Sequence, residues 1–137
     1  MFNNGISIKT GLEELAASAA GAVEIVRGNG TAVTSVEYDS RAVKKGSLFV
    51  AVEGYKSDGH RFVHAAAESG AAAICVAADR VDDFASLGER GIAILAAGDT
   101  RTALSRLSAA FFGFPSRAML AIGVTGTNGK TSITYML

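Results

Sequence analysis

This sequence of 137 residues has little cysteine, no excess charge of one sign and no long apolar run, and each absence excludes a class of protein. A single cysteine, Cys75, can form neither an internal disulfide nor a zinc site by itself. Thirteen basic residues balance thirteen acidic ones, so a broad basic face for nucleic acid or anionic lipid is not expected. The sequence has no apolar run of about 18 residues, the length of a membrane-spanning helix, and its start lacks the basic-then-apolar order of a secretory signal. We therefore expect a cytoplasmic monomer without nucleic-acid partners.

Apolar residues, in contrast, are plentiful. They make up 49% of the chain, against 19% charged residues, which is enough to bury a core and excludes a disordered polar chain. The length suits one domain, or one domain with a piece of another.

Short apolar runs alternate with helix-compatible segments through the first hundred residues. Strands are predicted at 23–27, 34–38, 48–52, 72–76 and 92–95. Helices are predicted at 10–21, 60–69 and 100–112. This order predicts an α/β fold in which helices flank a small mixed or parallel sheet.

Two local motifs refine the first part of this prediction. Thr10 and Glu13 have the spacing of a capping box at the start of the first helix. The tract Arg27-Gly28-Asn29-Gly30 carries a turn signal and suggests a hairpin or a tight loop between the first two strands.

The sequence changes character near Asp99. After the helix at 100–112, another apolar strand candidate at 119–124 runs into a glycine-rich loop and a helix-compatible end. Such a short second unit cannot hold a core alone, so the chain is expected to end inside a second domain. We divide it into a first domain at 1–98, a connecting helix and linker at 99–118, and the truncated start of a second domain at 119–137.

The glycine-rich loop is the sharpest motif. Backbone N–H groups in such a turn, between a strand and a helix, can surround a phosphate, and the helix N-terminus adds partial positive charge. Lys130 would reach the terminal phosphates, and the Thr131 hydroxyl would bind Mg²⁺. The usual phosphate-loop pattern requires glycine at the position of Val124, so this loop is a shorter variant. The predicted ATP-binding residues are Gly126, Thr127, Asn128, Gly129, Lys130, Thr131 and Ser132.

The loop resembles the signature of the Mur ligases, which are ATP-dependent amide-bond synthetases of peptidoglycan precursors. Earlier segments resemble the first domain of that family and the segment that leads to its ATPase domain. They are Tyr38-Asp39-Ser40-Arg41, Gly46-Ser47-Leu48-Phe49-Val50-Ala51, Gly54, Asp58-Gly59-His60-Arg61-Phe62 and Ala109-Ala110-Phe111-Phe112-Gly113-Phe114-Pro115-Ser116. The resemblance covers about residues 34–137. Ser132 departs from it, since the family usually has a second threonine there.

The resemblance implies that the first domain holds the UDP end of UDP-N-acetylmuramoyl-L-alanyl-D-glutamate. The residues implied in this contact are Tyr38, Ser40, Tyr55, Lys56 and Ser57. Hydroxyl groups and loop amides can bind uracil or diphosphate, Lys56 can offset phosphate charge, and Tyr55 can pack on the base or ribose. Asp39, Ser40 and Arg41 could instead form only a local turn with a surface ion pair, and we interpret Arg41 and Asp58 as loop organisers.

The resemblance also implies the reaction. ATP and Mg²⁺ would activate the D-glutamate carboxylate as an acyl phosphate, with Lys130 as the catalytic residue, and a diamino acid would then attack it. The diamino acid, either meso-diaminopimelate or L-lysine, would be bound by a C-terminal domain beyond Leu137, so the chain alone is expected to be inactive. Two alternatives stay open: the related ligase that adds D-alanyl-D-alanine, and a non-catalytic nucleotide-binding module.

Three further groups of residues have simpler interpretations. His60 and His64 are four residues apart, but two histidines without a third ligand rarely form a metal site, and His60 fits a helix start. Cys75 lies in an apolar run and is expected to be a buried, inert thiol. The phenylalanines at 111, 112 and 114 are expected to pack between domains.

Overall fold

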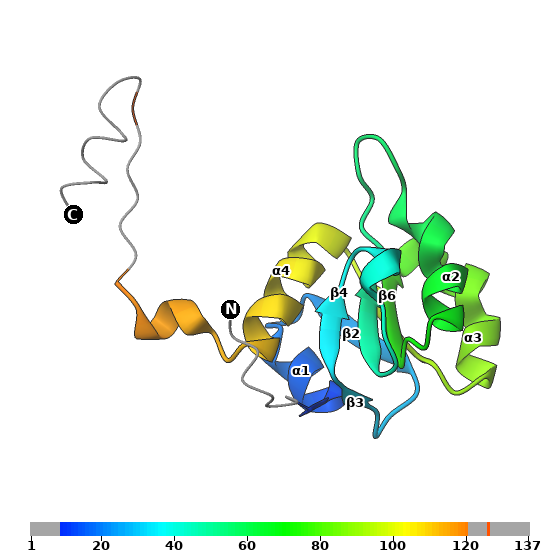
Figure 1. The fold of residues 1–137 in the computed structure, drawn as a ribbon, viewed down its shortest axis with the longest axis horizontal. Coiled ribbons are helices and arrows are strands. Elements are labelled where there is room, and N and C mark those ends of the chain that lie inside the picture. The colour runs from blue at the N-terminus through cyan, green and yellow to red at the C-terminus, as the bar shows by residue number, and fades with distance from the viewer. Residues whose placement is uncertain (1–8, 121–125, 127–137) are drawn as a thin grey trace.

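The computed structural model describes residues 9–120 and Gly126. Its centre is a five-stranded sheet in the order β2-β7-β6-β5-β4 (Figure 1). The strands are β2 Val23–Arg27, β4 Ser35–Glu37, β5 Ser47–Val50, β6 Ala73–Ala77 and β7 Ala93–Ala97. From β4 to β7 neighbouring strands are parallel, whereas β2 is antiparallel to β7. A separate two-stranded sheet pairs β1 Thr10–Gly11 with β3 Ala32–Val33. The predicted mixed α/β fold is confirmed.

Helices cover both faces of the large sheet (Figure 1). One face carries α1 Leu12–Ser18 and α4 Thr100–Phe111. The other carries α2 Val63–Glu68 and α3 Ala85–Glu89. Among the residues that the structure describes, short 3-10 helices lie at Ser40–Ala42, Gly59–Phe62, Ala78–Phe84 and Pro115–Ala118.

The β5 strand shows why a continuous apolar run forms here. Successive side chains of a strand point to opposite faces of the sheet. Leu48 and Val50 accordingly lie in the core beside α1 and α4, while Phe49 lies in the core beside α2 and α3. Because both faces are covered, every residue of β5 is buried, and the strand has no polar face to alternate with.

The α4 helix belongs to the same core. Its buried side chains Ala103, Leu107 and Phe111 join the cluster that also contains Leu12 and Leu15 of α1. The helix that was predicted to connect two domains therefore also covers one face of the sheet. Phe111 packs edge-on against Phe112, their ring centroids 5.3 Å apart.

Of the two structures predicted for the tract at 27–30, the hairpin is wrong and the tight loop agrees with the structure. The strands β2 and β4 lie at opposite edges of the five-stranded sheet, and the intervening chain forms β3 instead. Gly28 has a φ of +77°, and a Cβ at this position would lie 2.9 Å from the Ala93 Cα. The glycine-rich tract therefore makes a tight turn against β7, not a two-residue hairpin loop.

The predicted capping box is wrong as well. Gly11 occupies the N-cap position of α1 and has no side chain to bond the helix amides. Thr10 is instead paired with Val33 in the small sheet. The Glu13 carboxylate accepts a hydrogen bond from the backbone N–H of Gly30, so it fixes the loop before β3 rather than the helix start.

Within the described residues, no helix is both long enough and apolar enough to cross a membrane. The strand predicted at 119–124 and the ATP-binding loop lie outside the described residues, except for Met119, Leu120 and Gly126. Gly126 has a φ of +144°, a conformation that favours glycine.

Candidate functional site

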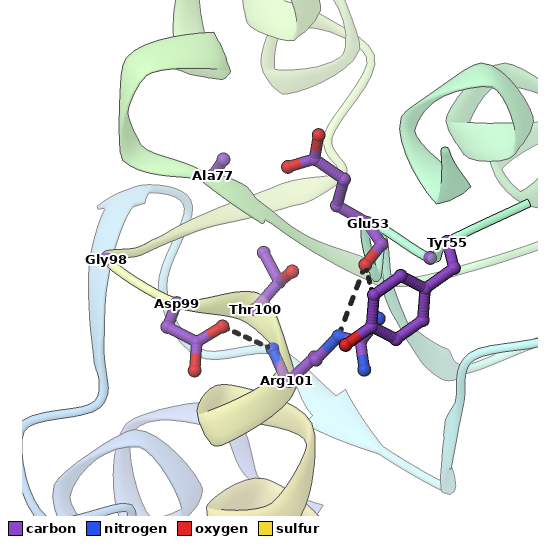
Figure 2. Close-up of a pocket in the computed structure, with 8 residues that line it drawn as sticks. Glu53, Tyr55, Ala77, Gly98, Asp99, Thr100 and Arg101 are labelled. Atoms are coloured by element: carbon purple, nitrogen blue, oxygen red, sulfur yellow. Dashed lines mark hydrogen bonds between the residues drawn. The ribbon is translucent and has the colours of Figure 1, made fainter. Parts of the chain in front are cut away.

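A pocket of about 470 Å³ opens at the carboxyl ends of the parallel strands (Figure 2). From β6 the chain continues into the 3-10 helix Ala78–Phe84 on one face of the sheet, whereas from β7 it continues into α4 on the other face. Connections that diverge to opposite faces leave a crevice at the strand ends, where open α/β sheets bind ligands. The pocket is lined by Glu53, Gly54, Tyr55, Ala77, Gly98, Asp99, Thr100 and Arg101.

The start of α4 forms one wall of this pocket. The Asp99 carboxylate caps the helix by accepting hydrogen bonds from the backbone N–H groups of Arg101 at 3.1 Å and Thr102 at 3.2 Å. Bonds from the Thr102 hydroxyl and from these amides lower the pKa of Asp99. The helix N-terminus is thus already matched by a carboxylate, which makes it a poor site for a second anion.

Arg101 crosses the pocket from α4 to the loop after β5. Its Nε and Nη2 atoms both donate hydrogen bonds to the Glu53 carbonyl oxygen, at 3.2 and 3.0 Å. Its guanidinium carbon lies 5.0 Å from the centre of the Tyr55 ring, within the range of a cation–π contact. Figure 2 shows the side chain of Arg101 between the backbone of Glu53 and the ring of Tyr55.

A second pocket, of about 400 Å³, lies at the end of β4. Its lining residues are Tyr38, Asp39, Ser40, Arg41 and Phe62. The Asp39 carboxylate accepts a hydrogen bond from the Arg41 backbone N–H at 2.9 Å. It also forms an ion pair with Arg41 Nη2 at 2.6 Å. These contacts lower the pKa of Asp39 to about 2, and the hydrogen bond from the Arg41 side chain is the largest cause. Arg41 thus organises the turn, as predicted, and Ser40 lies at the pocket wall.

The five residues predicted to contact UDP follow two neighbouring strands, but they do not form one cluster. Tyr38 and Ser40 line the second pocket, after β4, and Tyr55 lines the first, after β5. Lys56 and Ser57 are exposed and line neither pocket. They belong to a short turn in which the Gly54 N–H donates to the Ser57 carbonyl at 2.9 Å.

A buried histidine fixes the far end of the same loop. His60 Nε2 accepts a hydrogen bond from the Ala77 N–H at 3.0 Å, which assigns the ring proton to Nδ1. Nδ1 then donates to Asp58 Oδ1 at 2.6 Å, and Arg80 donates to Asp58 Oδ2 at 2.7 Å. The backbone bond from His60 is the largest cause that lowers the pKa of Asp58 to about 2. The network ties the loop to β6.

These contacts agree with the interpretation of His60 as part of a helix start. The 3-10 helix begins at Gly59 and is capped by Asp58. In the described part of the chain, no three His, Cys, Asp or Glu side chains gather as a metal site would require. Cys75 is buried in β6, and burial raises the pKa of its thiol to about 12, so the predicted inert thiol fits.

Sequence reasoning missed Arg101 and Arg80. Arg101 bonds Glu53, which is 48 residues away in the chain, and Arg80 bonds Asp58, which is 22 residues away. No local sequence pattern reveals contacts over such separations. A signal did exist for Asp99, because an aspartate directly before a helical stretch is a common N-cap. That cap places Arg101 in the first turn of α4.

Comparison with known proteins identifies the class to which this chain belongs. The family model for the Mur ligase family, catalytic domain, matches residues 32–112, which is more than half of the chain. This chain therefore belongs to the Mur ligase family.

Relatives with assigned functions narrow the comparison. The UDP-N-acetylmuramoyl-L-alanyl-D-glutamate--2,6-diaminopimelate ligase of Bacillus velezensis is 49% identical over 105 residues, which are 77% of this chain and 20% of that protein. The ligase of the same name from Chlorobaculum tepidum is 42% identical over 128 residues, 92% of this chain and 24% of that protein. The chain thus spans about a fifth of the length of these relatives.

The fold is also similar to solved structures. A crystal structure of MurF from Acinetobacter baumannii has a TM-score of 0.57 and 28% identity, over 74% of this chain and 21% of that one. A second structure from the same organism, titled as a UDP-N-acetylmuramoylalanyl-D-glutamyl-2,6-diaminopimelate--D-alanyl-D-alanyl ligase, has a TM-score of 0.56.

Proposed function

We propose that this chain is the nucleotide-substrate-binding part of an ATP-dependent ligase that adds a diamino acid to UDP-N-acetylmuramoyl-L-alanyl-D-glutamate. The observation that carries the proposal is the 49% identity to a ligase named for that substrate and for 2,6-diaminopimelate. The relatives so named cover the strand-end loops as well as the core, since their matches span 77 to 92% of the chain.

In this proposal the first domain, at 1–98, holds the UDP end of the substrate. Tyr38 and Ser40 after β4 and Tyr55, Lys56 and Ser57 after β5 would supply the contacts. Their position at one edge of the sheet supports this role, because loops at the carboxyl ends of neighbouring parallel strands can reach one ligand. Residues 99–118, whose helix α4 packs on the sheet, would connect this domain to the ATP-binding domain, which would begin at 119–137.

ATP binding is assigned to the loop from Gly126 to Ser132. Glycines let main-chain amides approach phosphate oxygens, and the Lys130 ammonium group would offset charge on the phosphoryl group that is transferred. The Thr131 hydroxyl is a hard oxygen donor of the kind that Mg²⁺ accepts beside phosphate oxygens. When bound, Mg²⁺ would neutralise phosphate charge during the transfer.

The proposed reaction has two steps. The D-glutamate carboxylate of the substrate attacks the γ-phosphorus of ATP, which forms an acyl phosphate and releases ADP. The amine of the diamino acid then attacks the acyl carbon, loses a proton and expels inorganic phosphate, so an amide bond replaces the mixed anhydride. In this proposal the residues of the first domain bind the nucleotide end of the substrate, whereas Lys130 acts on the phosphoryl group that is transferred.

The test uses the gene product that carries this chain. We expect ADP release only when UDP-N-acetylmuramoyl-L-alanyl-D-glutamate is present with meso-diaminopimelate or with L-lysine. With ¹⁸O in the reacting carboxylate, one ¹⁸O atom is expected in the inorganic phosphate. Peptide synthesis without that transfer would contradict the acyl phosphate.

The likeness to MurF structures supports a second candidate, the ligase that adds D-alanyl-D-alanine to the UDP-muramoyl tripeptide. The 28% identity to that protein is lower than the 49% identity to the diaminopimelate ligase, which favours the first candidate. A single assay separates them, because the two ligases consume different nucleotide substrates and different amines.

A further inference from the structure

Arg101 connects two parts of the site that differ in rigidity. Its backbone belongs to the first turn of α4, a helix of 12 residues whose Ala103 and Leu107 are fully buried in the core. Asp99 accepts a hydrogen bond from its N–H at 3.1 Å, so the origin of the side chain is fixed. The side chain then reaches the loop after β5.

The loop at the other end has little burial to hold it. Tyr55 is 99% exposed, and Lys56 and Ser57 are also exposed. Inside the loop, the Gly54 N–H bonds the Ser57 carbonyl, and Glu53 forms an isolated antiparallel bridge with Asp58. These contacts shape the turn, but they do not attach it to the helix layer.

Two separate attachments fix the loop to the rest of the domain. At its far end, Asp58 is bonded to His60 and Arg80. At its near end, Arg101 donates two hydrogen bonds to the Glu53 carbonyl and lies 5.0 Å from the Tyr55 ring centre. A guanidinium group suits this position because its planar donors can share one carbonyl while its face lies over an aromatic ring.

We propose that Arg101 is a positioning residue for the nucleotide substrate. It holds the segment Tyr55-Lys56-Ser57 in the conformation that binds the UDP end, and it acts through the Glu53 carbonyl and the Tyr55 ring. This inference rests on the proposed function, which assigns that segment to UDP. It adds a residue from the start of α4 that the sequence motifs do not include.

The experiment measures steady-state kinetics of the gene product with Arg101→Met and Arg101→Lys. Loss of a charge-assisted hydrogen bond typically weakens an interaction by roughly tenfold. We therefore expect Arg101→Met to raise KM for the UDP substrate by roughly tenfold, while kcat and KM for ATP change less than about twofold. Arg101→Lys keeps the charge but loses the planar fork, so we expect only partial rescue.

A double variant tests whether Arg101 acts through Tyr55. If the ring contact is part of the mechanism, the loss in Tyr55→Leu/Arg101→Met is smaller than the product of the two single losses, by about threefold or more. Losses that multiply, or a fall in kcat with KM unchanged, would overturn the positioning role.

A matched control lies on the same helix. Arg106 is exposed on α4 and lines neither of the two strand-end pockets, so Arg106→Met removes one positive charge from α4 and is expected to leave KM unchanged. An equal rise in KM for this variant would attribute the effect to net charge and contradict the proposal. Circular dichroism of each variant identifies misfolding. If Arg101→Met does not fold, the KM of a folded Arg101→Lys variant still tests the proposal, because it is expected to lie between the wild-type value and a roughly tenfold rise.

The two proposals fail in different ways. If the wild-type gene product does not consume the UDP substrate, the proposed function fails. If the wild type is active and Arg101→Met has the wild-type KM, only the role of Arg101 is overturned.

Discussion

His60 Nε2 accepts the backbone N–H of Ala77 at 3.0 Å, which links the loop after β5 to the last residue of β6. His60 is 3% exposed, and its other ring nitrogen is bonded to Asp58. A histidine that could have been a metal ligand or a catalytic base is therefore part of the framework of this edge of the sheet.

We expect His60→Ala to destabilise this edge by about 2 kcal/mol, because the Ala77 amide would be left without its partner. Amide hydrogen exchange of the gene product, followed by mass spectrometry, would show faster exchange in the peptide that covers 73–77. His60→Gln can place an amide oxygen near the Ala77 N–H, so the exchange rate of this peptide in His60→Gln should fall between those of the wild type and His60→Ala. Unchanged protection in His60→Ala would contradict the structural role.

Asp58 gives this framework a pH dependence. A carboxyl group whose pKa is lower in the folded chain than in the unfolded chain stabilises the fold at pH values above its pKa in the unfolded chain. The contribution is lost as the pH falls through the folded value, here from the ordinary 3.8 toward about 2. We therefore expect protection around Asp58 to fall over that acid range.

Asp58→Asn is the matched variant for this prediction. It should weaken protection near pH 7 and converge with the wild type as the pH falls toward about 2. Asp39 also has a pKa of about 2, but its ion pair with Arg41 is exposed, and Asp39→Asn should alter the acid response of the β6 peptide little. A wild-type acid response in Asp58→Asn would contradict this account.

The Cys75 thiol is expected to resist modification in the folded protein. It is fully buried in β6, and burial raises its pKa to about 12. Because the thiolate is the reactive form, a thiol-specific alkylating reagent at pH 8 should leave the peptide that contains Cys75 unmodified. The same peptide should react fully in denaturant. Rapid labelling under native conditions would place Cys75 outside the core.

Leu107 tests whether α4 belongs to the core of the sheet domain. Its side chain is fully buried, and replacement of such a leucine by alanine usually costs about 2 to 5 kcal/mol. We expect Leu107→Ala to reduce hydrogen-exchange protection in the sheet strands as well as in α4. A loss confined to α4 would show that the helix is only a connection between domains.

The sequence patterns predicted the central strands β5, β6 and β7 well, because continuous apolar runs are typical of strands buried on both faces. The sequence patterns gave wrong predictions where one local motif is compatible with two different structures. A glycine-rich tract marks a turn but does not say which strands pair, so a hairpin of β2 and β4 and a tight loop were both open, and only the structure shows that the two strands lie at opposite edges. The Glu13 carboxylate bonds Gly30, a partner 17 residues away, in place of its own helix start.

The site was predictable in part, for the same reason. Tyr38, Ser40 and Tyr55 lie at or just after strands that the sequence pattern predicted, and the structure places them at pocket walls. The contacts of Arg101 with Glu53 and of Arg80 with Asp58 depend on how helices pack across the sheet. Tertiary structure alone creates those pairs, so the positioning residues of the site were not foreseen.

The central claim is tested most directly by the product that the gene product forms from UDP-N-acetylmuramoyl-L-alanyl-D-glutamate, ATP and a diamino acid. The account predicts a nucleotide-linked tripeptide, detected by mass spectrometry, with one ADP released for each amide bond, and no product from Lys130→Met. Product formation by Lys130→Met at the wild-type rate, or no tripeptide from the wild type, would contradict it.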